Sequence, residues 1–480
     1  MDMNSMKTFA MKQAAKIIIN VVKNSSEDNM ARLFGTLKKF TKEPSYSGLE
    51  KMERLAREKD PVIEGFKKTF QRMGKVPLKK LVNNLIFNEF VIGANKRQAA
   101  SEEYQTVIPA LMVISPTYAC NLHCVGCYAG VYGNKYHLSK EEVEDIIKQA
   151  NELGMYFFVI SGGEPFFWPH LLDILEEFND SYFLIYSNGT FIDKDMAKRL
   201  AELGNATPAL SVEGFEKETD WRRGKGVYKK VTQAWEYMAE EGLIYGASIT
   251  STRLNHETLM KDEFWDMLES YGVGYAWVFQ YIPIGLGPDM KLAPTPQQRL
   301  ERFRKVEEVR LSGRFSTVAD FWNHGMLVNG CMAGGAKYLH INAKGMAEPC
   351  VFQHFAVDSI REKRLIEILK SPYFEAIKKM VPYDNNLLRP CMIIDHPQIL
   401  RNINKKFGAK PTHEGAENIT TKLAPELDKM AAEWKRLSDK VWYNEGYAEK
   451  YPVQHGWYSY ETRKIRQKER DEKIKQKERV

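Results

Sequence analysis

Short apolar runs alternate with amphipathic stretches of helical period from residue 107 to residue 312. The apolar runs predict buried strands near residues 108–115, 155–161, 182–187, 207–212, 244–251 and 274–281. The amphipathic stretches predict helices near residues 139–153, 169–179, 192–203, 227–242, 256–271 and 295–311. Strands that alternate with helices in this way indicate an α/β fold, a βα barrel whose chemistry lies at the carboxyl ends of its strands.

The first hundred residues are helical in pattern and strongly basic. They hold 20 Lys plus Arg and 10 Asp plus Glu, a net charge of +10 in a chain whose total is +7. Two apolar faces recur at helical spacing, one at Ala10, Met11, Ala14, Ile17, Ile18 and Val21 and one at Leu78, Leu81, Val82, Leu85 and Ile86. Basic amphipathic helices lie on anionic membranes or cap a domain with their lysines in solvent. Nucleic-acid binding is disfavoured because no aromatic residues are interleaved with the basic ones.

Composition and cysteine usage indicate a globular protein from a reducing compartment. Hydrophobic residues make up 44% and aromatic residues 12% of the 480 residues, and this length suits two or three domains. Six cysteines without a secretory pattern argue against a disulfide framework. The apolar runs are shorter than the roughly 20 residues that span a bilayer, and no signal-peptide pattern is present. We expect a cytoplasmic protein, with peripheral attachment to the inner face of the membrane as the alternative.

Three of the six cysteines lie close together after the first predicted strand, at Cys120, Cys124 and Cys127. Thiolates at spacings of four and three residues can reach three corners of one cubane iron–sulfur cluster. The fourth iron then has no protein ligand and is open to a small molecule. A zinc or scaffold site is the alternative for this spacing taken alone.

The cysteine spacing resembles the signature of the radical S-adenosylmethionine (radical SAM) superfamily. A Gly-Gly-Glu element follows the second strand at Gly162, Gly163 and Glu164, and the resemblance implies that it engages the amino group of the SAM methionine. Polar residues after the third and fourth strands, and an arginine before Gly224, imply further SAM contacts at Ser187, Asn188, Ser211, Glu213 and Arg223. The family resemblance also implies a partial (β/α)6 barrel, a catalytic 4Fe-4S cluster and anaerobic chemistry.

One position departs from the pattern of this family. Many relatives carry an aromatic residue directly before the third cysteine, stacked near the adenine of SAM. This chain has Gly126 there, so Tyr128 or backbone atoms would have to support the adenine.

The other three cysteines lie more than 200 residues downstream, at Cys331, Cys350 and Cys391. The run from Cys331 to Cys350 resembles the opening half of a SPASM or twitch module, which binds an auxiliary iron–sulfur cluster. The closing half is truncated to a single cysteine, so the resemblance implies three cysteine ligands. A fourth ligand would come from Asp395, His396, His354 or the substrate. Three buried structural cysteines are the alternative.

These patterns divide the chain into four regions. Residues 1–106 form a basic amphipathic helical region and residues 107–312 form the radical SAM partial barrel. Residues 313–411 form the SPASM/twitch-like auxiliary cluster module. Residues 412–480 form a C-terminal helix and a charged tail.

The resemblance implies an enzyme, an oxidoreductase or transferase, that cleaves SAM reductively and abstracts hydrogen from an unactivated C–H bond. It implies a low-potential electron donor such as ferredoxin or flavodoxin. The basic N-terminus favours an alkyl chain of a membrane lipid as substrate, with carbon–carbon coupling as one outcome. SPASM-like modules are common in peptide-modifying enzymes, so a peptide or protein maturase is the alternative. An iron–sulfur electron-transfer protein that never cleaves SAM is a third hypothesis, which the Gly-Gly-Glu element disfavours.

Overall fold

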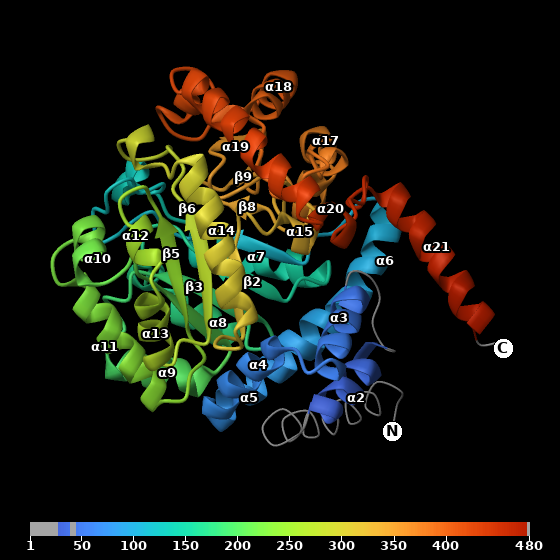
Figure 1. Cartoon of the computed structure of the whole chain (residues 1–480), viewed down its shortest axis with the longest axis horizontal. Coiled ribbons are helices and arrows are strands. Elements are labelled where there is room, and N and C mark those ends of the chain that lie inside the picture. The colour runs from blue at the N-terminus through green and yellow to red at the C-terminus, as the bar shows by residue number, and fades with distance from the viewer. Residues whose placement is uncertain (1–26, 39–44, 478–480) are drawn as a thin grey trace.

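A sheet of ten strands forms the centre of the computed structural model, which describes residues 27–38 and 45–477 (Figure 1). Seven of its strands run parallel and in chain order: β1 (Leu111–Ile114), β2 (Phe157–Ile160), β3 (Tyr182–Ser187), β4 (Ala206–Ser211), β5 (Gly246–Ser251), β6 (Tyr275–Gln280) and β7 (Thr317–Asp320). The predicted α/β barrel is confirmed, with strands β1 to β6 close to their expected ranges. Strand β7 extends the sheet beyond residue 312.

Helices cover the outer face of this sheet. They are α7 (Lys140–Glu152), α8 (Leu171–Glu177), α9 (Lys194–Leu203), α10 (Glu216–Arg223), α11 (Val227–Glu240), α12 (His256–Leu259), α13 (Asp262–Ser270) and α14 (Pro296–Leu311). Every second strand residue, such as Met112, Phe158 and Phe183, packs against them in one continuous apolar core. The helix expected over 256–271 is two helices, because Lys261 has extended backbone angles between α12 and α13.

The inward-facing strand residues pack against the N-terminal helices. These helices are α2 (Glu27–Lys38), α3 (Ser45–Arg57), α4 (Pro61–Arg72), α5 (Lys75–Lys80), the π-helix η1 (Leu81–Gly93) and α6 (Ala94–Tyr104). Val113, Val159 and Leu184 of the strands share one apolar cluster with Phe70 and Val82. The helices therefore close the barrel interior at its amino end, opposite the end that the sequence assigns to chemistry.

The second of the two predicted amphipathic faces is buried by this packing. Leu78, Leu81 and Val82 are at most 5% exposed, and Leu85 and Ile86 pack at the edge of the same cluster. The polar side of η1 is also engaged: the Asn84 side-chain amide donates to the backbone oxygens of residues 179 and 181. This face caps the barrel, which was one of the two alternatives. The first amphipathic face, at residues 10–21, lies outside the described residues.

The chain after β7 adds short strands to the other edge of the sheet. The strands are β8 (His340–Ile341), β9 (Met346–Glu348) and β11 (Asp358–Ser359), while β10 (Phe355–Ala356) pairs with β12 (Lys410–Pro411). Strand β8 is parallel to β1, so Val113 lies opposite His340. The C-terminal module is thereby joined to the strand that precedes the first three cysteines.

Helices of the C-terminal part lie around the sheet, with α18 and α19 beyond its carboxyl end (Figure 1). They are α15 (Gly325–Val328), α16 (Leu365–Leu369), α17 (Pro372–Met380), α18 (Pro397–Phe407), α19 (Ala424–Asn444), α20 (Tyr447–Lys450) and α21 (Tyr460–Lys477). Helix α19 packs along α14, whereas α21 projects from the body (Figure 1). Among the described residues, no helix combines the length and the apolar character that crossing a membrane requires.

Candidate functional site

The loop after β1 carries Cys120, Cys124 and Cys127 at the carboxyl end of the barrel. Backbone hydrogen bonds fix its shape: the N–H of Cys127 donates to the oxygen of Cys124 at 3.2 Å, and the N–H of Val125 donates to the oxygen of Arg222 at 2.8 Å. All three thiols are free. Burial raises the pKa of Cys120 to about 11. A metal centre offsets this cost because it stabilises the thiolate.

The Gly-Gly-Glu segment packs directly on the cysteine loop. The N–H of Gly163 donates to the oxygen of Thr117, and the N–H of Glu164 donates to the oxygen of Ala119, both at 2.9 Å. A Cβ atom at Gly162 would lie 2.3 Å from the oxygen of Thr117, and one at Gly163 would lie 2.2 Å from the oxygen of Ala119. Only glycine permits this approach, which brings Glu164 beside the cysteines.

The Glu164 carboxylate is buried and accepts three hydrogen bonds. They come from the backbone N–H groups of Phe166 and Asn188, at 3.1 and 2.7 Å, and from the Ser187 hydroxyl at 2.9 Å. The Asn188 side-chain amide lies 3.8 Å from the Cys120 sulfur. Burial raises the pKa of Glu164 to about 7, against the effect of these donors. The structure thus brings Glu164, Ser187 and Asn188 together next to the first cysteine.

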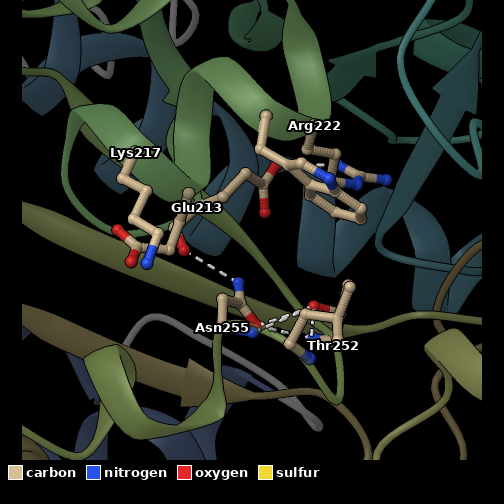
Figure 2. A pocket seen from close by; sticks show the side chains of 8 residues that line it. Glu213, Lys217, Arg222, Thr252 and Asn255 are labelled. Carbon is tan, nitrogen blue, oxygen red and sulfur yellow. Dashed lines mark hydrogen bonds and ion pairs between the residues drawn. The ribbon is translucent and has the colours of Figure 1, made fainter.

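A second polar group lies beside Cys124, at the carboxyl ends of β4 and β5 (Figure 2). Glu213 is 1% exposed, and its Oε1 accepts from Arg222 at 2.7 Å and from the Nε of Arg223 at 2.8 Å. Its Oε2 accepts from the N–H of Thr250 at 3.0 Å. Arg223 also reaches within 3.9 Å of the Cys124 sulfur. Glu213 therefore holds Arg223 beside the cysteine loop, while Ser211 ends β4 nearby.

The position before the third cysteine has a steric explanation that the sequence did not reveal. Gly126 has a φ of +63°, and a Cβ atom there would lie 2.5 Å from the ring of Tyr281. Tyr281, from the loop after β6, fills the space beside this residue. The hydroxyl of Tyr128 hydrogen-bonds Ser161 at 2.7 Å, at the start of the Gly-Gly-Glu segment.

The second set of cysteines lies in the C-terminal module, and its sulfurs are close enough to affect one another electrostatically. Burial raises the pKa of Cys331 to about 12, with neighbouring Cys350 adding to the shift, and it also raises the pKa of Cys391. The backbone N–H groups of Ala333 and Ile393 point at the sulfurs of Cys331 and Cys391, both at 3.4 Å. Backbone N–H groups aimed at sulfur suit thiolate ligands of an iron–sulfur cluster.

Comparison with known families agrees with both cysteine sets. The model of the radical SAM superfamily matches residues 114–270, and the model of the SPASM iron–sulfur cluster-binding domain matches residues 331–392. The chain therefore contains a radical SAM domain and a SPASM domain. These domains imply a 4Fe-4S cluster, SAM and an auxiliary iron–sulfur cluster.

Individual relatives of this chain are distant in sequence. The Fe-coproporphyrin III synthase of Methanosarcina barkeri is 28% identical over 43% of this chain, which spans 55% of that relative. The mycofactocin maturase MftC of Mycobacterium ulcerans is 26% identical over 59% of this chain and 78% of the relative. The crystal structure of Streptococcus suis SuiB bound to its precursor peptide SuiA shares the fold, with a TM-score of 0.50 and 20% identity, over 60% of this chain and 70% of that one.

The three side chains predicted as a fourth ligand in the SPASM domain already have partners within the protein. The two ring nitrogens of His354 pair with His413 at 2.7 Å and with the oxygen of Val351 at 3.0 Å. His396 bonds the oxygen of Arg389 through its Nε2 at 2.9 Å. The Asp395 carboxylate is paired with Arg299 at 2.5 Å. These groups serve the protein network around the cysteines.

Two tyrosine hydroxyls that the sequence analysis missed lie at the SPASM cysteines. The Tyr338 hydroxyl donates to the sulfur of Cys350 at 3.2 Å. Tyr383 packs in one cluster with Cys331, and its buried hydroxyl has no hydrogen-bond partner among the described residues. Tyrosine carries no motif at fixed spacing from these cysteines, so no sequence signal identified either residue.

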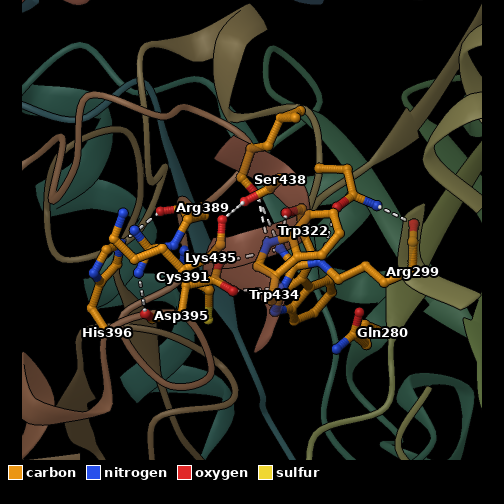
Figure 3. Close-up of polar contacts among 12 residues, drawn as sticks. Gln280, Arg299, Trp322, Arg389, Cys391, Asp395, His396, Trp434, Lys435 and Ser438 are labelled. Atoms are coloured by element: carbon orange, nitrogen blue, oxygen red, sulfur yellow. Dashed lines mark hydrogen bonds and ion pairs between the residues drawn. The ribbon is translucent and has the colours of Figure 1, made fainter. Parts of the chain in front are cut away.

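The segment that carries Cys391 is anchored to the barrel by Arg299 of α14 (Figure 3). Arg299 pairs with Asp395, whose other oxygen accepts from the N–H of Cys391 at 2.9 Å. The Arg299 guanidinium also lies over the ring of Trp434 in α19, 4.3 Å from its centre. Three elements distant in sequence therefore fix the third SPASM cysteine.

Aromatic rings occupy the space between the two cysteine sets. Tyr128 of the first loop meets Phe352, which follows Cys350, with 5.1 Å between ring centres. Phe352 also meets Trp322 at 5.3 Å. In the described part of the chain, no three His, Cys, Asp or Glu side chains converge to hold a single metal ion. A cubane spreads its ligands over separate irons, so its thiolates stand farther apart than those of one zinc ion.

Proposed function

We propose that this enzyme binds a four-iron cluster through Cys120, Cys124 and Cys127, cleaves SAM there and takes a hydrogen atom from a peptide or protein substrate. When bound there, the cluster would supply the electron for reductive cleavage of SAM, the chemistry by which such cofactors remove hydrogen from a C–H bond. The observation that carries the proposal is the placement of the buried Glu164 site against the cysteine loop.

The protein groups would hold the two charged ends of the methionine part of SAM. Glu164 offers a buried carboxylate, fixed by Ser187 and Asn188, to the amino group. Arg223, held by Glu213, offers a guanidinium to the SAM carboxylate. These charges lie beside Cys120 and Cys124 respectively, on two sides of the same cluster. Such fixed charges orient a ligand at little cost in reorganisation.

A second cluster would be held by Cys331, Cys350 and Cys391. The loops that carry these residues are fixed by β8 and β9 at one edge and by the Arg299–Asp395 pair at the other. The aromatic rings of Tyr128, Phe352 and Trp322 separate this cluster from the first. Rings in this position shield the reaction space from water and oxygen.

The comparisons favour the hypothesis of a peptide substrate. The relative named a maturase is matched over 78% of its length, and SPASM domains are common in peptide-modifying enzymes. The lipid hypothesis rested on two basic amphipathic faces, and the face at residues 78–86 is buried on the barrel. Other relatives are named a haem synthase and a probable GTP 3′,8-cyclase, so the substrate needs a direct test.

The test is anaerobic turnover of the reconstituted enzyme with SAM and dithionite. One reaction receives peptides from cells grown on deuterated amino acids, and the other receives lipids from cells grown on deuterated fatty acids. Mass spectrometry of the 5′-deoxyadenosine identifies the hydrogen source. Deuterium from the peptide fraction alone is the expected result.

Two outcomes would overturn parts of the proposal. Deuterium from the lipid fraction would restore the membrane-lipid substrate. Absence of 5′-deoxyadenosine from an enzyme that contains both clusters would favour the electron-transfer hypothesis. Glu164→Gln serves as the matched control for enzyme-dependent cleavage, and exposed Glu141→Gln on α7 serves as the neutral control.

A further inference from the structure

Two tyrosine side chains lie at the SPASM cysteines, Tyr338 at Cys350 and Tyr383 at Cys331. The Tyr338 hydroxyl lies 3.2 Å from the Cys350 sulfur, as a donor to that sulfur. Tyr338 precedes β8, the strand that joins the module to the barrel. Its position is therefore fixed by the sheet.

Tyr383 belongs to a different segment of the chain, which lies between Cys350 and Cys391 in the sequence. Its segment packs tightly on the chain before Cys331, because a Cβ atom at Gly330 would lie 2.8 Å from the side chain of Pro382. Tyr383 and Cys331 belong to one small apolar cluster with Tyr458. The Tyr383 ring also meets His396, with 5.8 Å between centres.

The buried hydroxyl of Tyr383 makes no well-formed hydrogen bond within the described protein, and the sulfur of Cys331 is the acceptor beside it. A buried hydroxyl without a hydrogen bond is unfavourable, so such groups usually meet a ligand or water. Cys331 packs in the same cluster as Tyr383, and the thiols of Cys391 and Cys350 also act on the hydroxyl electrostatically. Sulfur atoms of a bound cluster would provide the missing acceptor.

We propose that Tyr338 and Tyr383 are positioning residues that donate hydrogen bonds to the sulfurs of the auxiliary cluster and raise its reduction potential. This inference rests on the proposed binding of that cluster by Cys331, Cys350 and Cys391. Reduction adds negative charge to the cluster, and much of that charge resides on sulfur. A donor at sulfur therefore stabilises the reduced state more than the oxidised state.

The role proposed for the two tyrosines differs from that of an iron ligand. A ligand donates electron density to iron and its removal changes the number of protein bonds to the cluster. A hydroxyl donor leaves the three thiolates in place, and Tyr→Phe removes only the proton donor. Tyr338→Phe and Tyr383→Phe should consequently retain iron and sulfide content while lowering the midpoint potential of the auxiliary cluster.

The experiment is an anaerobic redox titration of the full-length enzyme with both clusters, followed by electron paramagnetic resonance. Adding SAM distinguishes the catalytic cluster, since SAM perturbs the signal of that cluster alone. We expect a negative shift of the auxiliary midpoint in each single variant, a larger shift in the double variant, and no shift of the catalytic midpoint.

Tyr182→Phe is the matched control, since the buried Tyr182 hydroxyl also lacks a partner within the described chain but packs in the barrel interior. The proposal fails if Tyr338→Phe leaves the auxiliary midpoint unchanged, or if Tyr182→Phe shifts it equally. Loss of the auxiliary iron from Tyr383→Phe would make that residue a ligand and overturn its role as a donor. Wild-type enzyme with one cluster but normal SAM cleavage would overturn the inference and leave SAM cleavage standing.

Discussion

Glu164 shows how a single buried charge can be maintained for a ligand. Its carboxylate has no counter-charge in hydrogen-bonding contact, and three neutral donors hold it instead. Burial accordingly raises its pKa to about 7. A cationic ammonium group placed beside this carboxylate would relieve the cost of burial, which is the role proposed for the SAM amino group.

Replacing Glu164 by glutamine should therefore weaken SAM binding more than it weakens the fold. The variant loses the charge, and its amide NH2 opposes the N–H of Asn188 or the hydroxyl of Ser187. We expect the dissociation constant for SAM to rise on the order of 10- to 100-fold, equivalent to about 1.5–3 kcal/mol. Equilibrium binding of SAM to the cluster-loaded enzyme measures this dissociation constant. Unchanged SAM affinity with normal iron content would contradict the assignment.

Gly163 provides a steric test of the same site. An alanine Cβ there would lie 2.2 Å from the oxygen of Ala119, which directly precedes Cys120. Gly163→Ala must displace the cysteine loop, so we expect iron to be lost from the catalytic cluster while the SPASM cluster stays. Gly48→Ala is the control, since no atom lies within 4 Å of its added Cβ. If Gly163→Ala kept the wild-type iron content of the catalytic cluster, the cysteine loop would be able to move aside without weakening cluster binding.

Among the elements, α14 links the barrel to the SPASM domain. Its Arg299 makes a bidentate contact with Asp395, donates to Asn323 and stacks on Trp434. Lysine carries the same charge but lacks the planar fork that these partners share. The anchor of Cys391 thus depends on the shape of the side chain as well as on its charge.

Arg299→Lys should loosen the Cys391 segment and lower the iron content of the auxiliary cluster. Breaking one side of a buried ion pair costs on the order of 3–5 kcal/mol, and the single ammonium group of lysine recovers only part of it. Iron and sulfide analysis with electron paramagnetic resonance would show the loss. The catalytic cluster should be unaffected. Arg304→Lys, an exposed ion pair on the same helix, should change neither cluster.

The sequence predicted the regular elements well and their tertiary partners poorly. Strands at 182–187 and 274–281 and the helix at 295–311 were found within one or two residues, because each is a periodic segment with clear turn signals. The cysteines and the Gly-Gly-Glu element could also be identified in the sequence from their spacing. Tyr281, Tyr338 and Arg299 could not be identified in this way, because their roles depend on residues that are distant in sequence. The short strands β7 and β8 are set by pairing with long strands, which no local pattern records.

At the scale of the whole molecule, the barrel is closed at both ends by different means. The N-terminal helices fill its amino end with apolar side chains, among them Phe70 and Val82. At the carboxyl end, a buried polar network joins the barrel to the SPASM domain. Tyr132 hydrogen-bonds Thr412 at 2.7 Å, and Thr412 donates to Glu348 at 2.6 Å. The carboxyl end thus contains buried titratable groups that join the barrel to the SPASM domain.

His354 lies in this network and should make the domain junction sensitive to acid. Its ring packs against Tyr132 and bonds His413. Burial is the main cause that lowers the pKa of His354 from 6.5 to about 4, and neighbouring His413 and His340 act in the same direction while Glu348 opposes it. The unfolded chain binds a proton below pH 6.5, whereas the folded chain binds it only near pH 4. Stability is therefore complete above pH 6.5 and falls as the pH drops through the window from 6.5 to 4.

Urea unfolding at pH 7.5 and pH 5.5 measures this effect. We expect wild-type enzyme to lose about 1 kcal/mol at pH 5.5 through His354. His354→Gln has no proton to gain in the unfolded state, so its unfolding should depend less on pH by that amount, whatever its stability at pH 7.5. His170→Gln, at an exposed position before α8, should retain the wild-type dependence. An equal pH dependence in wild type and His354→Gln would mean that the folded histidine already binds its proton near pH 6.5, and that the junction is open to water.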